Sequence, residues 1–278
     1  MNFHKASEKY FTKGLNMETQ TRRNLFQLLN ALGYILSIIV NALANILPIN
    51  GRNTGEISDS IPNLFVPAGL TFSIWGLIYL LQAGFAGYQV KNVVKKETEH
   101  LEFVDQIGIW FFVGSIANTL WVILWHYGYV SLTLVLMLIL LGSLLTIYIR
   151  LGIGKSNPPT IQKLTIHLPT SVYLGWITVA TIANVTAVLV TEGWNGWGIS
   201  EEIWTVLVIV AAVIITSLML LLRKDVAYAL VVVWAILGIW IKRTSVGFEN
   251  SIVATTALIA IIIIIIILIL KLITDRKK

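Results

Sequence analysis

The sequence predicts an all-α integral membrane protein, a helical bundle with eight transmembrane helices. Hydrophobic residues make up 56% of the 278 residues, they gather in eight long runs, and every charged residue lies outside those runs. Because a charge near the middle of a bilayer is costly, charge-free runs of about 20 residues are typical of spanning helices. The predicted spans are 25–47, 68–88, 107–126, 130–149, 169–190, 203–222, 226–241 and 252–270.

The basic residues predict the orientation of these spans. When Lys and Arg are assigned to successive connecting segments, 17 of the 20 fall on the side of the two termini, and only Arg52, Lys242 and Arg243 fall on the other. Cytoplasmic segments carry an excess of Lys and Arg, so both termini are expected in the cytoplasm of a prokaryotic plasma-membrane protein. The net charge of +6 is thus explained by membrane topology. We expect the lipid bilayer as a partner and no nucleic acid.

The composition changes after residue 190. The first five spans are rich in Asn, Trp and Tyr, whereas the last three are more uniformly aliphatic and end in an Ile-rich run. We therefore divide the chain into a soluble tail, 1–23, a five-helix unit, 24–190, and a three-helix extension, 191–278, which is expected to pack against the outside of the unit. The loop 191–202 contains Trp194 and Trp197, which we interpret as anchors at the membrane interface.

The first span carries a polar stripe. At about 100° per residue, one face of this helix collects Gln27, Asn30, Tyr34, Ser37, Asn41 and Asn45. Amides that face lipid would lack hydrogen-bond partners, so the stripe is expected to point into the bundle. Two interpretations stay open: hydrogen bonds between helices, or contact of one or two members with a ligand.

Three further spans place Trp beside hydrogen-bonding residues. Their faces contain Thr71, Trp75, Tyr79 and Gln82; Phe111, Asn118, Trp121 and Trp125; and Tyr173, Trp176, Ala180 and Asn184. Trp75, Trp121 and Trp176 lie deeper in their spans than interfacial anchors need to. Facing aromatic rings with a few placed polar groups suit a flat apolar ligand. Aromatic packing of the bundle core explains the same periodicity equally well.

The spans lack the usual catalytic side chains. They contain no Asp, Glu or Lys that could act as acid, base or nucleophile, and the chain has no Cys. His126 and His167 lie near opposite ends of their spans, which is too far apart for one metal site. We expect no enzymatic activity, no metal and no required cofactor. The uncharged interior also argues against coupling to protons or ions.

Three motifs resemble the TspO/MBR family, the tryptophan-rich sensory proteins. The segment 67–79, with Phe72, Trp75 and Tyr79, looks like the family's Pro-Pro-Gly…Phe…Trp…Tyr segment. Asn118-Thr-Leu-Trp121 resembles the Asn-x-x-Trp of its third helix. The spacing of Tyr173, Trp176, Ala180 and Asn184 is similar to its fifth helix, although Val172 replaces the expected proline and no Lys or Arg follows until Arg223.

The resemblance implies a five-helix bundle with a pocket, and a chain that extends the family's fold by three helices. Family members bind porphyrins and related tetrapyrroles, and in mitochondria also sterols. By analogy, the pocket would be lined by Trp75 and Trp176, with Tyr79, Asn118, Trp121, Tyr173, Ala180 and Asn184 around it.

Together these observations predict a membrane receptor or sensor that binds a flat hydrophobic small molecule, such as a porphyrin or another tetrapyrrole, haem included. The alternative is a facilitative carrier of a neutral or amphipathic small molecule. Gly84, Gly87 and Gly142 allow close helix contacts, so a homodimer is compatible with the sequence.

Overall fold

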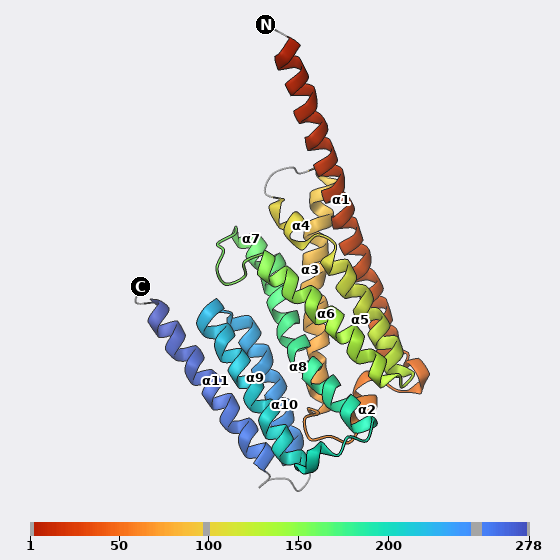
Figure 1. Ribbon diagram of the computed structural model, residues 1–278, viewed down its shortest axis with the longest axis vertical. Coiled ribbons are helices and arrows are strands. Elements are labelled where there is room, and N and C mark those ends of the chain that lie inside the picture. Colours follow the sequence, from red (N-terminus) through yellow and green to blue (C-terminus); the bar gives the residue numbers. More distant parts are fainter. Residues whose placement is uncertain (1–2, 97–100, 246–251, 277–278) are drawn as a thin grey trace.

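The computed structural model describes residues 3–96, 101–245 and 252–276, with side chains from residue 17 onward, and all secondary structure in these ranges is helical (Figure 1). The long helices are α1 Phe3–Ile46, α3 Ile74–Val94, α5 Trp110–His126, α6 Val130–Arg150, α8 Leu168–Thr191, α9 Glu201–Arg223, α10 Val226–Thr244 and α11 Ile252–Arg276. Shorter elements are η1 Ile49–Gly51, α2 Thr54–Asp59, η2 Gly69–Ser73, α4 Glu102–Ile107, α7 Thr160–Gln162, η3 Lys163–His167 and η4 Gly196–Gly198. The all-α prediction is confirmed.

Seven of the described helices are long and apolar enough to cross a membrane. The eighth predicted span corresponds to α5, which has 17 residues and is about 26 Å long at 1.5 Å per residue. This helix is shorter than expected because Gly108, with a φ of 54°, separates it from α4. α5 nevertheless lies inside the bundle, packed against α1 and α6. The expected number of eight spans therefore depends on this short helix.

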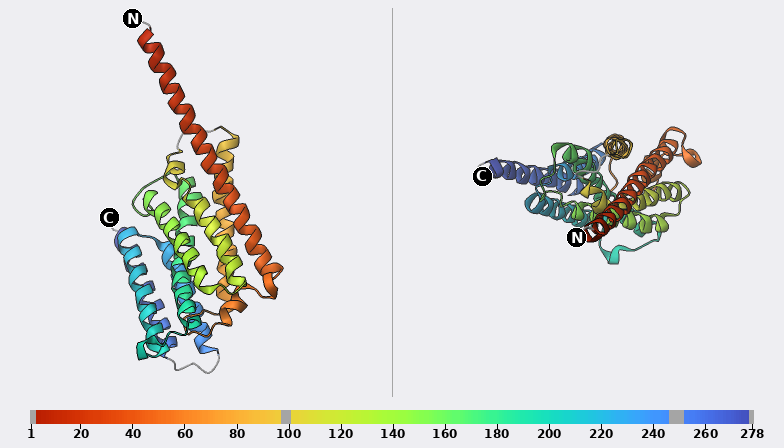
Figure 2. Two further views of the ribbon diagram at one scale, coloured as in Figure 1. Left: turned by 45° about the vertical axis from the view of Figure 1, so that its right-hand side comes forward. Right: turned by 90° about the horizontal axis from the view of Figure 1, so that it is seen from above.

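The helices form two groups that meet at α10. α5 packs on α1 and α6, α6 packs on α8, and α3 packs on α1 and α8. α10 contacts α8, whereas α9 and α11 pack on α10 and on each other (Figures 1 and 2). The connections 47–73 and 192–200 lie at the end of the bundle remote from the termini, which we call the loop end (Figure 1).

The segment before the first predicted span is part of the first helix. The expected tail, residues 1–23, is helical from Phe3 as part of α1, and its first turns project beyond the other helices (Figure 1). Residues 3–23 contain no proline and are rich in Lys, Glu and other residues that favour helices. The boundary between tail and bundle is therefore not a break in secondary structure.

The polar stripe of α1 makes hydrogen bonds to neighbouring helices. Asn30 Nδ2 donates to Gln89 Oε1 of α3 at 2.9 Å, and Asn41 Nδ2 donates to Asn118 Oδ1 of α5 at 3.0 Å. All four side chains are buried. Because lipid offers no alternative partners, these bonds help to fix the position of α1. For Asn30 and Asn41, the structure supports the interpretation as contacts between helices.

The extension helix α10 is hydrogen-bonded to the segment that precedes α3. Trp234 Nε1 donates to the carbonyl of Thr71 at 3.0 Å, and the backbone N–H of Ala68 donates to the carbonyl of Gly238 at 2.9 Å. The two segments touch so closely that a Cβ atom on Gly238 would lie 1.9 Å from Thr71 Oγ1. α10 therefore supports the backbone of η2 directly.

A second contact holds the opposite end of α10. Asp225, which is only 6% exposed, accepts hydrogen bonds from Tyr148 Oη at 2.8 Å and from the backbone N–H of Tyr228 at 3.0 Å. The guanidinium of Arg223 lies 5.6 Å from the centre of the Tyr148 ring. Asp225 is thus both the N-cap of α10 and a link to α6.

Candidate functional site

A small cavity lies between α3, α5, α6 and α8 in the loop-end half of the bundle. Its volume is about 50 Å³. It is lined by Thr54, Ser58, Asn63, Val66, Pro67, Phe72, Trp75, Trp121, Trp125, Met137, Trp176, Val179, Ala180, Ala183, Asn184 and Ala187. We call it the buried cavity. α2 and the following loop cover it at the loop end, where Trp125 Nε1 donates to the carbonyl of Thr54 at 3.3 Å.

Trp75 is the centre of an aromatic cluster on one wall of the buried cavity. Its ring stacks on Tyr79 at a centroid distance of 5.6 Å, and it meets Tyr173 and Trp176 edge to face at 6.0 and 6.1 Å. Phe72 completes the cluster, with its ring edge to face with Trp176 at 6.0 Å. Such pairs stabilise one another by about 0.5–1.5 kcal/mol beyond the burial of their surface. The cluster joins η2 and α3 to α8.

A chain of hydrogen bonds includes two other wall residues, Trp121 and Asn184. Trp121 Nε1 donates to Asn184 Oδ1 at 3.0 Å, and Asn184 Nδ2 donates to Thr133 Oγ1 at 3.0 Å. Trp121 also stacks on Trp125 with a centroid distance of 5.3 Å. These bonds connect α5, α8 and α6. They satisfy the polar atoms of the Asn184 side chain within the protein, so we expect its part in ligand binding to be structural.

Two polar atoms beside the aromatic cluster have no hydrogen-bond partner in the described part of the chain. Trp176 is 3% exposed, and its indole N–H forms no hydrogen bond with any described residue; the same is true of the Tyr79 hydroxyl. A buried donor without a partner costs about 1–3 kcal/mol. Each is therefore a place where a ligand oxygen or nitrogen would gain a hydrogen bond that the protein does not supply.

A larger groove adjoins the buried cavity. It lies between α1, α2 and α3 and has a volume of about 660 Å³. Its walls are Ile38, Asn41, Ala42, Asn45, Ile46, Asn53, Gly55, Glu56, Asp59, Gly69, Phe72, Ser73, Trp75, Gly76 and Tyr79. We call it the α1–α3 groove. Only Phe72 and Trp75 line both spaces, so these two rings are the partition between them.

The structure brings the eight residues named from the sequence into one region. Trp75, Trp121, Trp176, Ala180 and Asn184 line the buried cavity, and Tyr79 lines the α1–α3 groove. The other two lie behind these walls, where Tyr173 packs on the ring of Trp75 and Asn118 is bonded to Asn41 of α1. Their assignment as ligand-binding residues stays a prediction.

Several wall residues were not named from the sequence. Phe72 belonged to the Pro67–Tyr79 motif, and Trp125 shared the face of Trp121, so both had a signal in the spacing. Thr133 and Met137 of α6 had none, because nothing in their span distinguishes the buried face from the lipid-facing one. Thr71 was expected to share a face with Trp75, and its contact with α10 was not predicted by the spacing.

This arrangement is a helical bundle with Trp residues around an internal cavity whose lining contains no charged residue, and it is that of an integral membrane protein. A model of the protein family described as TSPO-like protein matches residues 27–270, and the chain belongs to this family. The matched range runs beyond residue 190 through most of α11, so it includes the extension. No curated protein and no solved structure matches the chain.

Proposed function

We propose that this protein is a non-catalytic membrane receptor or sensor for a flat hydrophobic small molecule of the porphyrin or tetrapyrrole class. The observation that carries the proposal is the buried Trp176 indole, whose N–H has no partner among the described residues and whose ring meets that of Trp75 edge to face in the wall of the buried cavity. Aromatic faces would stack on a flat ring system, and the free N–H would fix its orientation.

The size of the cavity implies that the ligand enters by a conformational change. Small-molecule sites commonly have volumes of about 300–1,000 Å³, and the buried cavity, at about 50 Å³, is well below that range. The α1–α3 groove, at about 660 Å³, lies within it. Rotation of Phe72 and Trp75 would join the two spaces. A ligand would then lie in the groove and extend one edge towards Trp176.

The contact with α10 gives a route by which binding would be sensed. Phe72 belongs to η2, and the neighbouring Thr71 accepts a hydrogen bond from Trp234 of α10. Displacement of Phe72 would therefore strain a bond to the extension. We therefore expect the extension to carry the signal of ligand binding away from the pocket.

Binding can be tested by quenching of intrinsic tryptophan fluorescence with protoporphyrin IX, haem and cholesterol. Trp176→Ala is expected to weaken a flat ligand by about 1–3 kcal/mol, and Ala180→Phe is expected to block the site. Trp110→Ala is the matched control. Trp110 is the first residue of α5, and its ring contacts Arg150 instead of lining the cavity. Equal affinities for the wild type and the Trp176 variant would contradict the proposal.

A facilitative carrier is the second candidate, and the lateral α1–α3 groove beside the cavity is the observation that favours it. Proteoliposomes separate the two candidates. A carrier would release an enclosed tetrapyrrole at a rate that falls with Ala180→Phe. A sensor would bind the same molecule without releasing it.

A further inference from the structure

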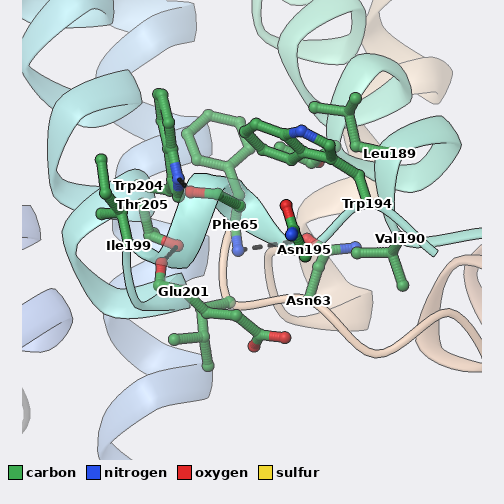
Figure 3. Close-up of a pocket in the computed structure, with 13 residues that line it drawn as sticks. Asn63, Phe65, Leu189, Val190, Trp194, Asn195, Ile199, Glu201, Trp204 and Thr205 are labelled. Atoms are coloured by element: carbon green, nitrogen blue, oxygen red, sulfur yellow. Dashed lines mark hydrogen bonds between the residues drawn. The ribbon is translucent and has the colours of Figure 1, made fainter.

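A second cavity lies at the loop end, where α8 ends and α9 begins. Its volume is about 230 Å³ (Figure 3). It is lined by Asn63, Leu64, Phe65, Thr186, Leu189, Val190, Trp194, Asn195, Gly196, Ile199, Glu201, Trp204 and Thr205. We call it the tryptophan chamber. None of the eight residues of the candidate site lines it, and Asn63 is the one residue that lines both this chamber and the buried cavity.

The aromatic wall of the chamber is held in place by the loop. Trp194 and Trp204 lie with ring centroids 5.1 Å apart, and Trp197 packs against both from outside the chamber. Trp204 Nε1 donates to the carbonyl of Gly196 at 2.9 Å. Interfacial anchors need no such mutual contacts. The interpretation of this loop as a pair of separate anchors is therefore incomplete, since its Trp residues form one side of a cavity.

One acidic residue, the exposed Glu201, is part of the chamber lining. Figure 3 places Glu201 across the chamber from the rings of Trp194 and Trp204. No described Lys or Arg forms an ion pair with Glu201, and the chain has no Lys or Arg from residue 164 to residue 222. Glu192 and Glu202 lie nearby in sequence. A cation that enters the chamber would meet a carboxylate on one side and indole faces on the other.

The chamber continues into an apolar groove between α8 and α9. This second space, about 320 Å³ in volume, shares Thr186, Leu189, Trp194, Trp204 and Thr205 with the chamber and adds Thr181, Ile182, Val185 and Val208. We call it the α8–α9 groove. It exists because α9 packs on α10 and α11 rather than along α8. Val185 is exposed in it, so the groove opens towards the surrounding bilayer.

We propose that the tryptophan chamber and the α8–α9 groove together bind a membrane lipid whose head group carries an ammonium ion. The ammonium group lies between Glu201 and the indole rings, and an acyl chain follows Ile182 and Val185 along α8. The negative charge of the glutamates in this region argues against a lipid with an anionic head group. The N-terminus of α9 would attract an anion, but the Ser200 side chain already caps it, and two glutamates occupy its first turn.

The test measures lipid adducts of the full-length protein in dodecyl maltoside by native mass spectrometry. The probes are palmitoyl lysophosphatidylcholine, palmitoyl lysophosphatidylglycerol and choline chloride. We expect the phosphocholine lipid to bind about fivefold to tenfold more tightly than the phosphoglycerol lipid, the range that one cation–aromatic contact with a carboxylate produces. Glu201→Gln should remove this preference. Glu202→Gln, in the same helical turn but outside the chamber, should keep it.

The acyl chain is tested separately. Val185→Phe fills the α8–α9 groove and should weaken both lipids about equally, whereas Leu207→Phe, exposed on α9 outside the groove, should weaken neither. Melting temperatures of all four variants identify any that fails to fold. Equal binding of the two lipids, or equal effects of the two glutamate changes, would overturn the head-group assignment. Binding of choline chloride as tight as that of the lipid would overturn the lipid assignment.

Discussion

The contact between Gly238 and Thr71 gives the sharpest test of how the extension supports the pocket. A Cβ atom on Gly238 would lie 1.9 Å from Thr71 Oγ1 and 2.9 Å from both its Cβ and Cγ2, so rotation of Thr71 cannot remove the overlap. Gly238→Ala must therefore push α10 away from η2. Such a displacement breaks the hydrogen bonds of Trp234 to Thr71 and of Ala68 to Gly238.

The expected magnitude follows from these bonds. Each contributes about 0.5–1.5 kcal/mol, and the overlap itself costs about 1–3 kcal/mol. Replacing a helical Gly by Ala returns about 1 kcal/mol. We expect a net loss of about 3 kcal/mol, which at about 2–4 °C per kcal/mol lowers the melting temperature by roughly 6–12 °C. The measurement is thermal unfolding of the purified protein in detergent, followed by tryptophan fluorescence.

Two further variants make this result interpretable. Gly142→Ala is the matched control, because it lies inside α6 and a Cβ atom there would have no neighbour within 4 Å. Its melting temperature should be unchanged or slightly higher. Thr71→Gly combined with Gly238→Ala should recover part of the loss, since it removes the obstructing side chain. If the Gly238 and Gly142 variants melt alike, the reasoning about a close contact is refuted.

Three other outcomes are expected. Asp225→Ala should lower the free energy of unfolding by about 2 kcal/mol, because it removes the cap of α10 and leaves the Tyr148 hydroxyl without its partner. Asp225→Asn should lower this free energy less, and equal losses for the two variants would contradict the capping role. Asn184→Ala should lower the melting temperature, because two buried hydrogen bonds are lost, and an unchanged value would refute their structural importance. In this cysteine-free chain, an impermeant maleimide added to intact cells should label Ser60→Cys and not Ser156→Cys, and the reverse pattern would refute cytoplasmic termini.

The sequence predicted which residues of a helix share a face, because that depends only on helical geometry. Trp176, Ala180 and Asn184 recur at intervals of four, and all three line one cavity. The inward direction of Asn30 and Asn41 was equally predictable, since lipid cannot satisfy an amide. In both cases the argument needed only the helical period and the polarity of the surroundings.

The sequence was less informative where the backbone leaves the regular helical period. Residues 69–73 form a 3₁₀ turn after Pro67, and residues advance by about 120° in such a turn instead of 100°. Thr71 contacts Gly238 and Trp234 of α10, a contact that the spacing did not predict. The small size of the buried cavity was also unpredictable, because it depends on how α2 and the loop up to Pro67 cover it.

The hydrogen bonds between α10 and η2 have a consequence for the biogenesis of the protein. Thr71 and Trp234 are 163 residues apart in the chain, so the first of them is synthesised and inserted long before its partner exists. Until α10 enters the membrane, the backbone groups of residues 68–71 lack two of their final partners. The pocket wall beside Phe72 therefore acquires its final form only late in synthesis. A nascent chain halted after α8 should expose that wall to proteases that a finished chain resists.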